Sequence, residues 1–119
     1  MQRILVQENN RRLMMRRAID INVPQSHFEV PGEEFCGDRY QKAEEAYLVQ
    51  VVKVMRKSLG WKLVRHDDVT SLLMYFKKKG AEVFLVYDTM YGIELCTLDD
   101  TFDLQSLFDE INNHLKNDV

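Results

Sequence analysis

Residues 61–98 read WKLVRHDDVTSLLMYFKKKGAEVFLVYDTMYGIELCTL. This stretch contains four apolar runs separated by short polar breaks, and the runs are Trp61–His66, Thr70–Lys77, Glu82–Asp88 and Gly92–Leu98. Breaks of roughly 3–5 residues, rich in Asp, Lys and Gly, suit hairpin turns better than long crossover connections. The pattern therefore predicts a four-stranded antiparallel meander.

Two amphipathic segments flank the predicted meander. The first is predicted to be a helix over residues 38–59, because Asp38 is a good N-cap, apolar residues recur at helical spacing and Gly60 follows. The second is predicted to be a helix over residues 103–116, with an apolar stripe formed by Leu104, Leu107, Phe108, Ile111 and Leu115. A sheet this apolar needs cover, so we expect an α+β fold in which both helices pack on the sheet.

The first 37 residues have a less regular pattern. Residues 8–19 could form a short basic helix between paired arginines, with an apolar side made of Leu13, Met14, Met15 and Ile19. Pro24 and Pro31 bracket a segment that is extended at most, because residues before proline avoid the helical region. We therefore treat residues 1–37 as an N-terminal extension with a loop, and residues 38–119 as a single α+β domain.

The composition is that of an ordinary globular protein. Of the 119 residues, 45% are hydrophobic and 29% are charged. The longest apolar runs are far shorter than the roughly 18 residues that a membrane-spanning helix needs, and residues 1–6 are too short for the apolar part of a secretion signal. Two isolated cysteines, Cys36 and Cys96, suit free thiols in a reducing compartment. We expect an intracellular chain, in the cytoplasm or the nucleus.

Charge is distributed unevenly along the chain. The net charge is −3, but the charged residues in 53–79 are mostly basic and those from Asp99 onward are mostly acidic. Such an asymmetry can steer an anionic partner, although it is also compatible with ordinary solvation of exposed faces. On a regular strand, Lys62 and Arg65 would lie on opposite faces. The candidate binding residues are the basic positions that could converge on one end of the sheet: Arg56, Lys57, Lys62, Arg65, Lys77, Lys78 and Lys79.

The expected partner of this basic cluster is a protein, with an acidic phospholipid as an alternative. Nucleic acid is less favoured, because no stacking aromatic residues interleave with the lysines and the net charge is negative. The acidic final helix also differs from the basic one that double-stranded-RNA domains need.

Residues that could carry catalysis or hold a metal do not come together in the sequence. His66, Asp67 and Asp68 are adjacent, but neighbours on a turn diverge, and no further ligand stands at a suitable spacing. His27 and His114 are isolated, and no glycine pattern for phosphate binding occurs. We therefore predict that the chain is not an enzyme, has no metal site or cofactor, and acts by binding.

From about Leu48 to its end, the chain carries the pattern of a helix, a glycine–aromatic step, a meander and a closing helix. The motifs are Val51–Lys57 leading into Leu59-Gly60-Trp61-Lys62-Leu63-Val64, then Glu82–Val86, Tyr91–Leu95 and Asp100–Leu104. On these motifs the chain resembles the kinase-associated domain 1 superfamily, the C-terminal regulatory module of AMP-activated-type and calcineurin-B-like-interacting kinases. The resemblance implies a non-catalytic regulatory module that binds a kinase domain, partner subunits or acidic phospholipid head groups.

Two other classes of protein stay open. The chain is also similar to the RWD-like globular ends of kinetochore subunits, which join a long helix to a meander and a final helix and work as paired docking units. The third class is a small inhibitor protein that masks a target enzyme. A lipid- or phosphate-binding module predicts affinity that falls steeply with salt and with neutralisation of Lys77–Lys79, whereas a paired docking module predicts a dimer with little salt sensitivity.

Overall fold

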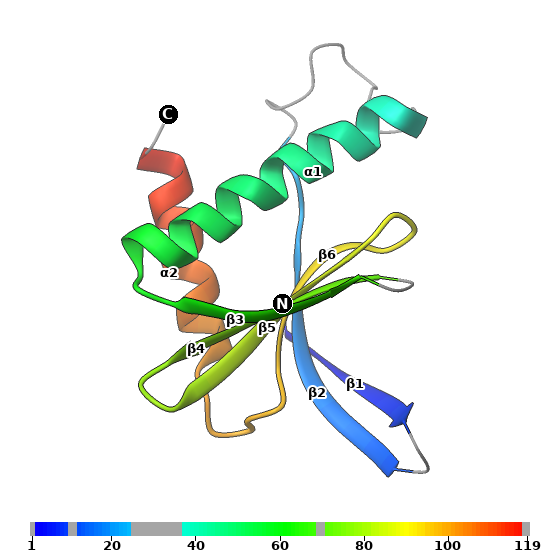
Figure 1. Ribbon diagram of the computed structural model, residues 1–119, viewed down its shortest axis with the longest axis vertical. Coiled ribbons are helices and arrows are strands. Elements are labelled where there is room, and N and C mark those ends of the chain that lie inside the picture. Colours follow the sequence, from blue (N-terminus) through cyan, green and yellow to red (C-terminus); the bar gives the residue numbers. More distant parts are fainter. Residues whose placement is uncertain (1, 10–11, 25–36, 69–70, 118–119) are drawn as a thin grey trace.

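The computed structural model describes residues 2–9, 12–24, 37–68 and 71–117 of the chain. These residues form one antiparallel sheet with two helices (Figure 1). The predicted α+β class is therefore confirmed. In chain order the elements are β1 (Gln2–Asn9), β2 (Arg12–Ile21), α1 (Gly37–Lys53), the π-helical turn η3 (Val54–Ser58), β3 (Lys62–Asp68), β4 (Leu72–Lys78), β5 (Ala81–Asp88), β6 (Gly92–Thr97) and α2 (Leu104–Asn117).

The meander predicted from residues 61–98 is present as strands β3 to β6. Each strand pairs antiparallel with the next, so the sheet order β6-β5-β4-β3 follows the chain. Gly80 and Gly92 close two of the hairpins with φ angles of +82° and +81°, which residues with a Cβ rarely adopt. Asp67 and Asp68, which the sequence pattern places in a turn, instead complete β3.

The N-terminal residues differ from the prediction. The short helix expected over residues 8–19 is wrong, because β1 and β2 form an antiparallel pair over residues 2–9 and 12–21. β2 in turn pairs with β6, with Arg17 opposite Thr97. The sheet therefore has six strands in the order β1-β2-β6-β5-β4-β3, not the four that were predicted.

The outer edge of β6 explains this difference. The backbone N–H and C=O groups of a buried strand need partners on both sides, and β2 supplies them on the outer side of β6. A short isolated helix is only marginally stable, so pairing with β6 outweighs the local helical pattern. Ile19 and Ile21 are buried on one side of β2 while Asp20 is exposed, which is the alternation of a strand. The predicted extension thus contributes two strands to the sheet.

Both predicted helices are confirmed, with small changes at their ends. α1 and η3 together span residues 37–58, and Gly60 follows with a φ angle of +76°. α2 begins directly after Asp103, whose carboxylate accepts hydrogen bonds from the backbone N–H of Ser106 at 3.1 Å and from its hydroxyl at 2.7 Å. Asp103 therefore acts as the N-cap of α2.

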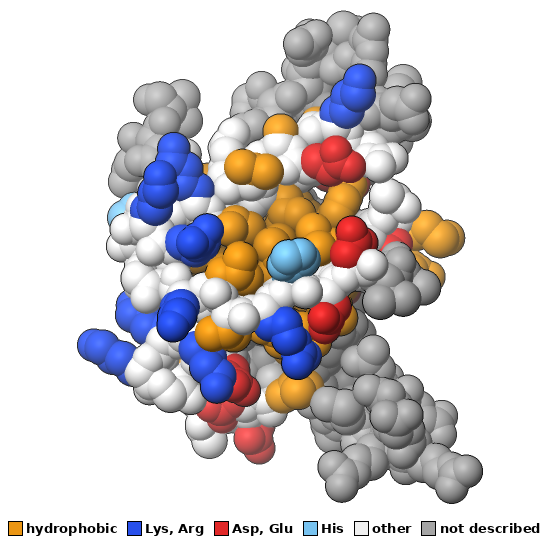
Figure 2. Space-filling view, in the orientation of Figure 1, with side chains coloured by type: hydrophobic (Ala, Val, Ile, Leu, Met, Phe, Trp, Pro, Cys, Tyr) orange, Lys and Arg blue, Asp and Glu red, His pale blue; other side chains and the backbone are white. Residues whose placement is uncertain are grey.

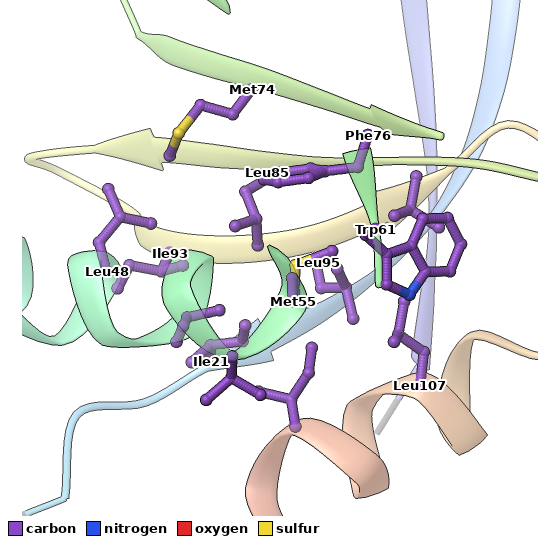
Figure 3. Packing of buried hydrophobic residues seen from close by; sticks show 14 of the residues in the cluster. Ile21, Leu48, Met55, Trp61, Met74, Phe76, Leu85, Ile93, Leu95 and Leu107 are labelled. Atoms are coloured by element: carbon purple, nitrogen blue, oxygen red, sulfur yellow. The ribbon is translucent and has the colours of Figure 1, made fainter. Parts of the chain in front are cut away.

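The two helices pack on the same face of the sheet and enclose the main hydrophobic core (Figure 3). Alternate strand residues enter this core, and Phe76 and Leu85 are completely buried there. Met55 of η3 and Leu107 of α2 reach the same cluster. Trp61 lies at one end of this cluster. The core therefore joins every layer of the described fold.

A second, smaller cluster lies on the opposite face of the sheet. It contains Ala18, Phe84, Val86 and Cys96, with Leu73 and Tyr75 packed against it. The rings of Tyr75 and Phe84 are stacked, with their centroids 5.6 Å apart. Among the described residues, no helix has both the length and the apolar composition needed to cross a membrane.

Arg17 joins β2 to the connection between β6 and α2. Its guanidinium donates hydrogen bonds to the backbone carbonyls of Asp99 and Phe102. The ring of Phe102 meets Trp61 edge-on, with the centroids 5.8 Å apart. The half-buried Arg17 side chain therefore holds the segment that leads into α2 against the sheet.

Gly92→Ala should destabilise the fold more than Gly80→Ala. Each alanine would enter the left-handed region at a cost of about 1–2 kcal/mol. A Cβ at Gly92 would also lie 3.0 Å from Oε2 of Glu44, whereas a Cβ at Gly80 would meet nothing within 4 Å. Urea unfolding measures the free energy of unfolding of both variants, and the difference between the two values reports the contact with Glu44. Equal losses of stability would contradict this account.

Candidate functional site

The structure brings most of the predicted basic residues to one end of the sheet. Arg56 and Lys57 lie on η3, and Lys62 lies at the start of β3, which follows shortly after. Lys77–Lys79 lie at the turn between β4 and β5, and Lys77 is opposite Lys62 in the sheet. Figure 2 shows Lys and Arg side chains gathered on the left of the molecule, where these elements meet.

Two of the three lysines at the β4–β5 turn are engaged within the chain. Nζ of Lys78 donates a hydrogen bond to the carbonyl of Leu59 at 2.5 Å and lies 6.0 Å from the centroid of the Trp61 ring. Nζ of Lys77 lies 3.1 Å from the carboxylate of Glu82. Both side chains of this ion pair are more than half exposed, so the pair contributes little stability. Lys78 thus has a structural role, and Lys79 is exposed at the tip of the turn.

A π-helical turn, η3, ends the first helix at this basic end. The N–H of Leu59 donates to the carbonyl of Val54 at 3.0 Å, and the N–H of Trp61 donates to the carbonyl of Met55 at 2.8 Å. Turns of this width are rare and often occur at functional sites. Here the apolar residues of the turn enter the core, while its two basic residues remain exposed.

A groove lies between the first helix, including η3, and strand β3. We call it the edge groove. Its lining combines apolar and basic side chains: Val49, Val52, Lys53, Arg56, Lys57, Trp61, Lys62 and Leu63. Figure 2 shows apolar surface in the middle of the view, between α1 and β3. Val49 is 66% exposed, so the groove presents apolar surface to solvent.

Lys53 lines the edge groove although it was not among the predicted binding residues. Residues three and four positions apart on a helix share a side, and Lys53 stands at this spacing from Arg56 and Lys57. That spacing is the signal in the sequence that would have identified it.

A β-bulge in β3 changes which side chains share a face of the sheet. The pairing with β4 skips Val64, because Leu63 and Arg65 lie opposite two consecutive residues of β4. Lys62 and Arg65 therefore lie on the same face, away from the helices, and not on opposite faces as a regular strand predicts. The remaining residues of β3 alternate regularly, which places His66 and Asp68 on the helix side and Asp67 beside Arg65.

Arg65 lies apart from the basic residues of the edge groove. Its Nε is 3.5 Å from Oδ2 of Asp67, and its guanidinium carbon lies 4.3 Å from the centroid of the Tyr75 ring. The two charged side chains are 62% and 44% exposed. An ion pair this exposed is weak and leaves both groups accessible to a partner.

The surface along α1 and β3 is basic at one end, where the edge groove lies, and acidic at the other. α1 and β3 run in opposite directions along it, because the chain reverses after η3 (Figure 1). The basic lining residues come from the end of the first helix and the start of β3. Glu45, earlier in α1, and Asp68, at the end of β3, lie toward the other end. Figure 2 shows acidic side chains on that side.

No family model, curated protein or solved structure matches the chain.

The described side chains offer few groups for catalysis or metal binding. No group of three or more His, Cys, Asp or Glu residues that could hold a metal ion occurs in the described ranges. His66 is exposed on β3, His114 is half-buried on α2, and the side chain of Cys96 is buried. His27 and Cys36 lie outside the described residues.

One buried carboxylate belongs to α1 and lies away from the edge groove. Glu44 is 3% exposed, and the hydroxyl of Tyr87 donates to its Oε1 at 3.5 Å. Burial also raises the pKa of the nearby Tyr47 hydroxyl in the same helix. These groups lie at the edge of the core, where they orient α1 on the sheet.

Three aspartates next to a turn or a helix end have pKa values below the ordinary value of 3.8, because neighbouring donors stabilise their charged forms. For Asp103 the donors are the hydroxyl and then the N–H of Ser106. For Asp99 they are the same two groups of Thr101. For Asp88 the N–H of Met90 comes first, and the Ser71 hydroxyl follows.

Ser106→Ala should raise the pKa of Asp103 toward 3.8, because it removes the hydroxyl that is the main cause of the shift. A carboxyl-carbon NMR titration measures this, with Asp88 in the same sample as an internal control. The lowered pKa stabilises the fold fully above pH 3.8, and this contribution is lost as the pH falls through the folded-state pKa. An unchanged Asp103 midpoint in the variant would show that the hydroxyl is not the cause.

Proposed function

We propose that the chain is a non-catalytic protein-interaction module that binds an extended protein segment along the edge groove. The observation that carries this proposal is the exposed edge of β3 beside an apolar groove with a basic end. An edge strand presents a row of backbone N–H and C=O groups, and a partner can bind by adding a strand to it. Apolar side chains of that segment would pack on Val49, Val52 and Leu63.

Charge defines the kind of segment that fits the edge groove. Lys53, Arg56 and Lys57 in the edge groove attract carboxylates, whereas Asp68, beyond the groove at the far end of β3, repels them. A fitting segment is therefore acidic at one end only. In a segment that runs antiparallel to β3, the acidic end is the C-terminal half, which lies beside Lys62. Complementary charges of this kind increase the association rate and select the direction of binding.

A binding role agrees with what the sequence resemblances imply. The kinase-associated domain 1 superfamily provides regulatory modules whose basic surface residues contact partners, and RWD-like domains provide docking units. An inhibitor protein would use a comparable surface to mask its target. The edge groove is a binding surface that suits each of these three roles.

Peptide selection from a random library displayed on phage should enrich linear peptides with acidic residues at one end. The combined change Lys57→Glu and Lys62→Glu should strongly weaken their binding, because it cancels the positive charge of the basic residues that line the edge groove. Raising the salt concentration should weaken binding to the wild-type chain. Fluorescence anisotropy with the selected peptides measures both effects.

The matched control combines Lys79→Glu with Lys116→Glu. This variant has the same change in net charge, and both lysines are exposed and absent from the lining of the edge groove. It should retain peptide binding. Selected peptides without acidic enrichment, or equal losses in the two variants, would contradict the proposal. Binding to phosphatidylserine vesicles that is lost only in the Lys79 variant would instead favour a phospholipid ligand at the β4–β5 turn.

A further inference from the structure

Strand β3 ends the described sheet, so one row of its backbone N–H and C=O groups faces outward. Most of its side chains are exposed, in contrast to the buried strands at the centre of the sheet. Such an edge is a template for another strand, and proteins usually protect it with charged residues and bulges. β3 has both protections, and their arrangement points to a particular partner.

We propose that a second copy of this chain occupies the edge groove, with the two β3 strands paired antiparallel about a two-fold axis at His66. This inference rests on the proposed function, because it identifies the extended segment that the edge groove accepts. Around that axis, Arg65 of each copy lies opposite Asp67 of the other. Both residues lie on the same face of the sheet, so the pairing forms two symmetric ion pairs.

The charges of β3 select this register over its neighbours. If one strand slides by two residues along the other, side chains still meet on matching faces. In one direction this places Arg65 opposite Arg65 of the other copy, and in the other direction it places Asp67 opposite Asp67. Like charges directly opposite each other are destabilising. A slip by a single residue would bring side chains of opposite faces together. The bulge at Val64 confines regular pairing to the segment that contains these charges.

The helices on either side of this axis are also complementary. A two-fold axis places the α1 helices of the two copies antiparallel across the paired strands, with their edge grooves facing each other. The basic end that contains Lys53 and Arg56 then faces the acidic end of the other copy, where Glu45 and Asp68 lie. The exposed side chain of Val49 lies between the two ends and is available to pack in the interface.

The second copy also meets the requirement for a segment that is acidic at one end only. β3 begins with Lys62 and ends with Asp67 and Asp68. In the proposed register Asp68 of one copy lies opposite Val64 of the other, so its acidic end points toward the basic edge groove, which begins at Leu63. A uniformly acidic peptide would instead place carboxylates against Asp68. The observed charge order therefore favours self-association.

Two charge-reversal variants test the register. Arg65→Asp gives each copy two acidic residues at the paired positions, and Asp67→Arg gives each copy two basic residues. Either variant alone should dimerise at least about tenfold more weakly than the wild-type chain, because like charges meet across the axis. Their equimolar mixture should form a heterodimer. In the mixture, residues 65 and 67 of each chain still carry like charges, so the ion pair within a strand is not restored. Recovered association therefore reports contact between residues 65 and 67 of different copies.

Analytical ultracentrifugation over a concentration series measures these masses, and circular dichroism checks that each variant is folded. Both side chains are exposed, so the fold should tolerate the changes. A wild-type chain that stays monomeric, a dimer that neither variant weakens, or a mixture that does not associate would overturn the proposal. A monomer that still binds one-end-acidic peptides in the library experiment would leave the proposed function intact, which separates the two failures.

Discussion

Phe76→Ala should lower the free energy of unfolding by about 3–5 kcal/mol. Phe76 lies on the inner face of β4, opposite Leu63 of β3 and Val83 of β5, and its side chain is completely buried. Removing the ring leaves a cavity in a densely packed core between the sheet and the helices, and the surrounding residues can fill it only in part. Equilibrium urea unfolding, followed by the fluorescence of Trp61, measures the loss.

Val49→Ala is the matched surface control for this experiment. The side chain of Val49 is 66% exposed, so its truncation should change stability by no more than about 0.5 kcal/mol. Phe76→Leu keeps much of the apolar volume and should cost less than Phe76→Ala. A loss no larger than that of Val49→Ala would be incompatible with the packing in Figure 3.

Arg17→Ala should lower the free energy of unfolding by about 2–3 kcal/mol, the effect expected for lost hydrogen bonds from a charged donor. The guanidinium donates to the carbonyls of Asp99 and Phe102, so its removal releases the segment before α2 from β2. Because Phe102 packs on Trp61, the fluorescence of this tryptophan should also change in the folded variant.

Arg17→Lys separates the effect of charge from that of geometry. Lysine keeps the positive charge but lacks the planar guanidinium that reaches two carbonyls together, so its stability should lie between those of the wild type and Arg17→Ala. Arg65→Ala removes an exposed arginine and should have a much smaller effect on unfolding. If the losses for Arg17→Ala and Arg65→Ala were equal, Arg17 would not have the structural role described here.

Arg17 illustrates how far the sequence could predict this protein. Its neighbours form a run of arginines and methionines, and this local pattern suggested an amphipathic basic helix. In the structure the same residues form β2, whose stability depends on pairing with β6 near the other end of the chain. Alternation within a segment does not identify the distant strand with which it pairs, so the local pattern could not reveal the pairing of β2 with β6.

The candidate site was predicted in part. Arg56, Lys57 and Lys62 line the edge groove, as the clustering of basic residues suggested, but Lys77 and Lys78 are engaged with groups of the chain itself. The position of Arg65 depended on the bulge at Val64, which the residues of β3 do not indicate. A bulge is set by pairing with the neighbouring strand, and pairing is a property of the assembled sheet.

The antiparallel meander, the two helices and the basic character of one end of the sheet could all be predicted from the sequence. These features depend on turn residues, caps and the alternation of apolar residues, all of which act between near neighbours. The tertiary structure was needed to show that β2 pairs with β6, that the half-buried Arg17 ties β2 to the segment before α2, and that an apolar groove with basic residues lies between the first helix and the start of β3. These features arise from contacts between segments far apart in the chain, whose formation depends on the packing of the whole fold.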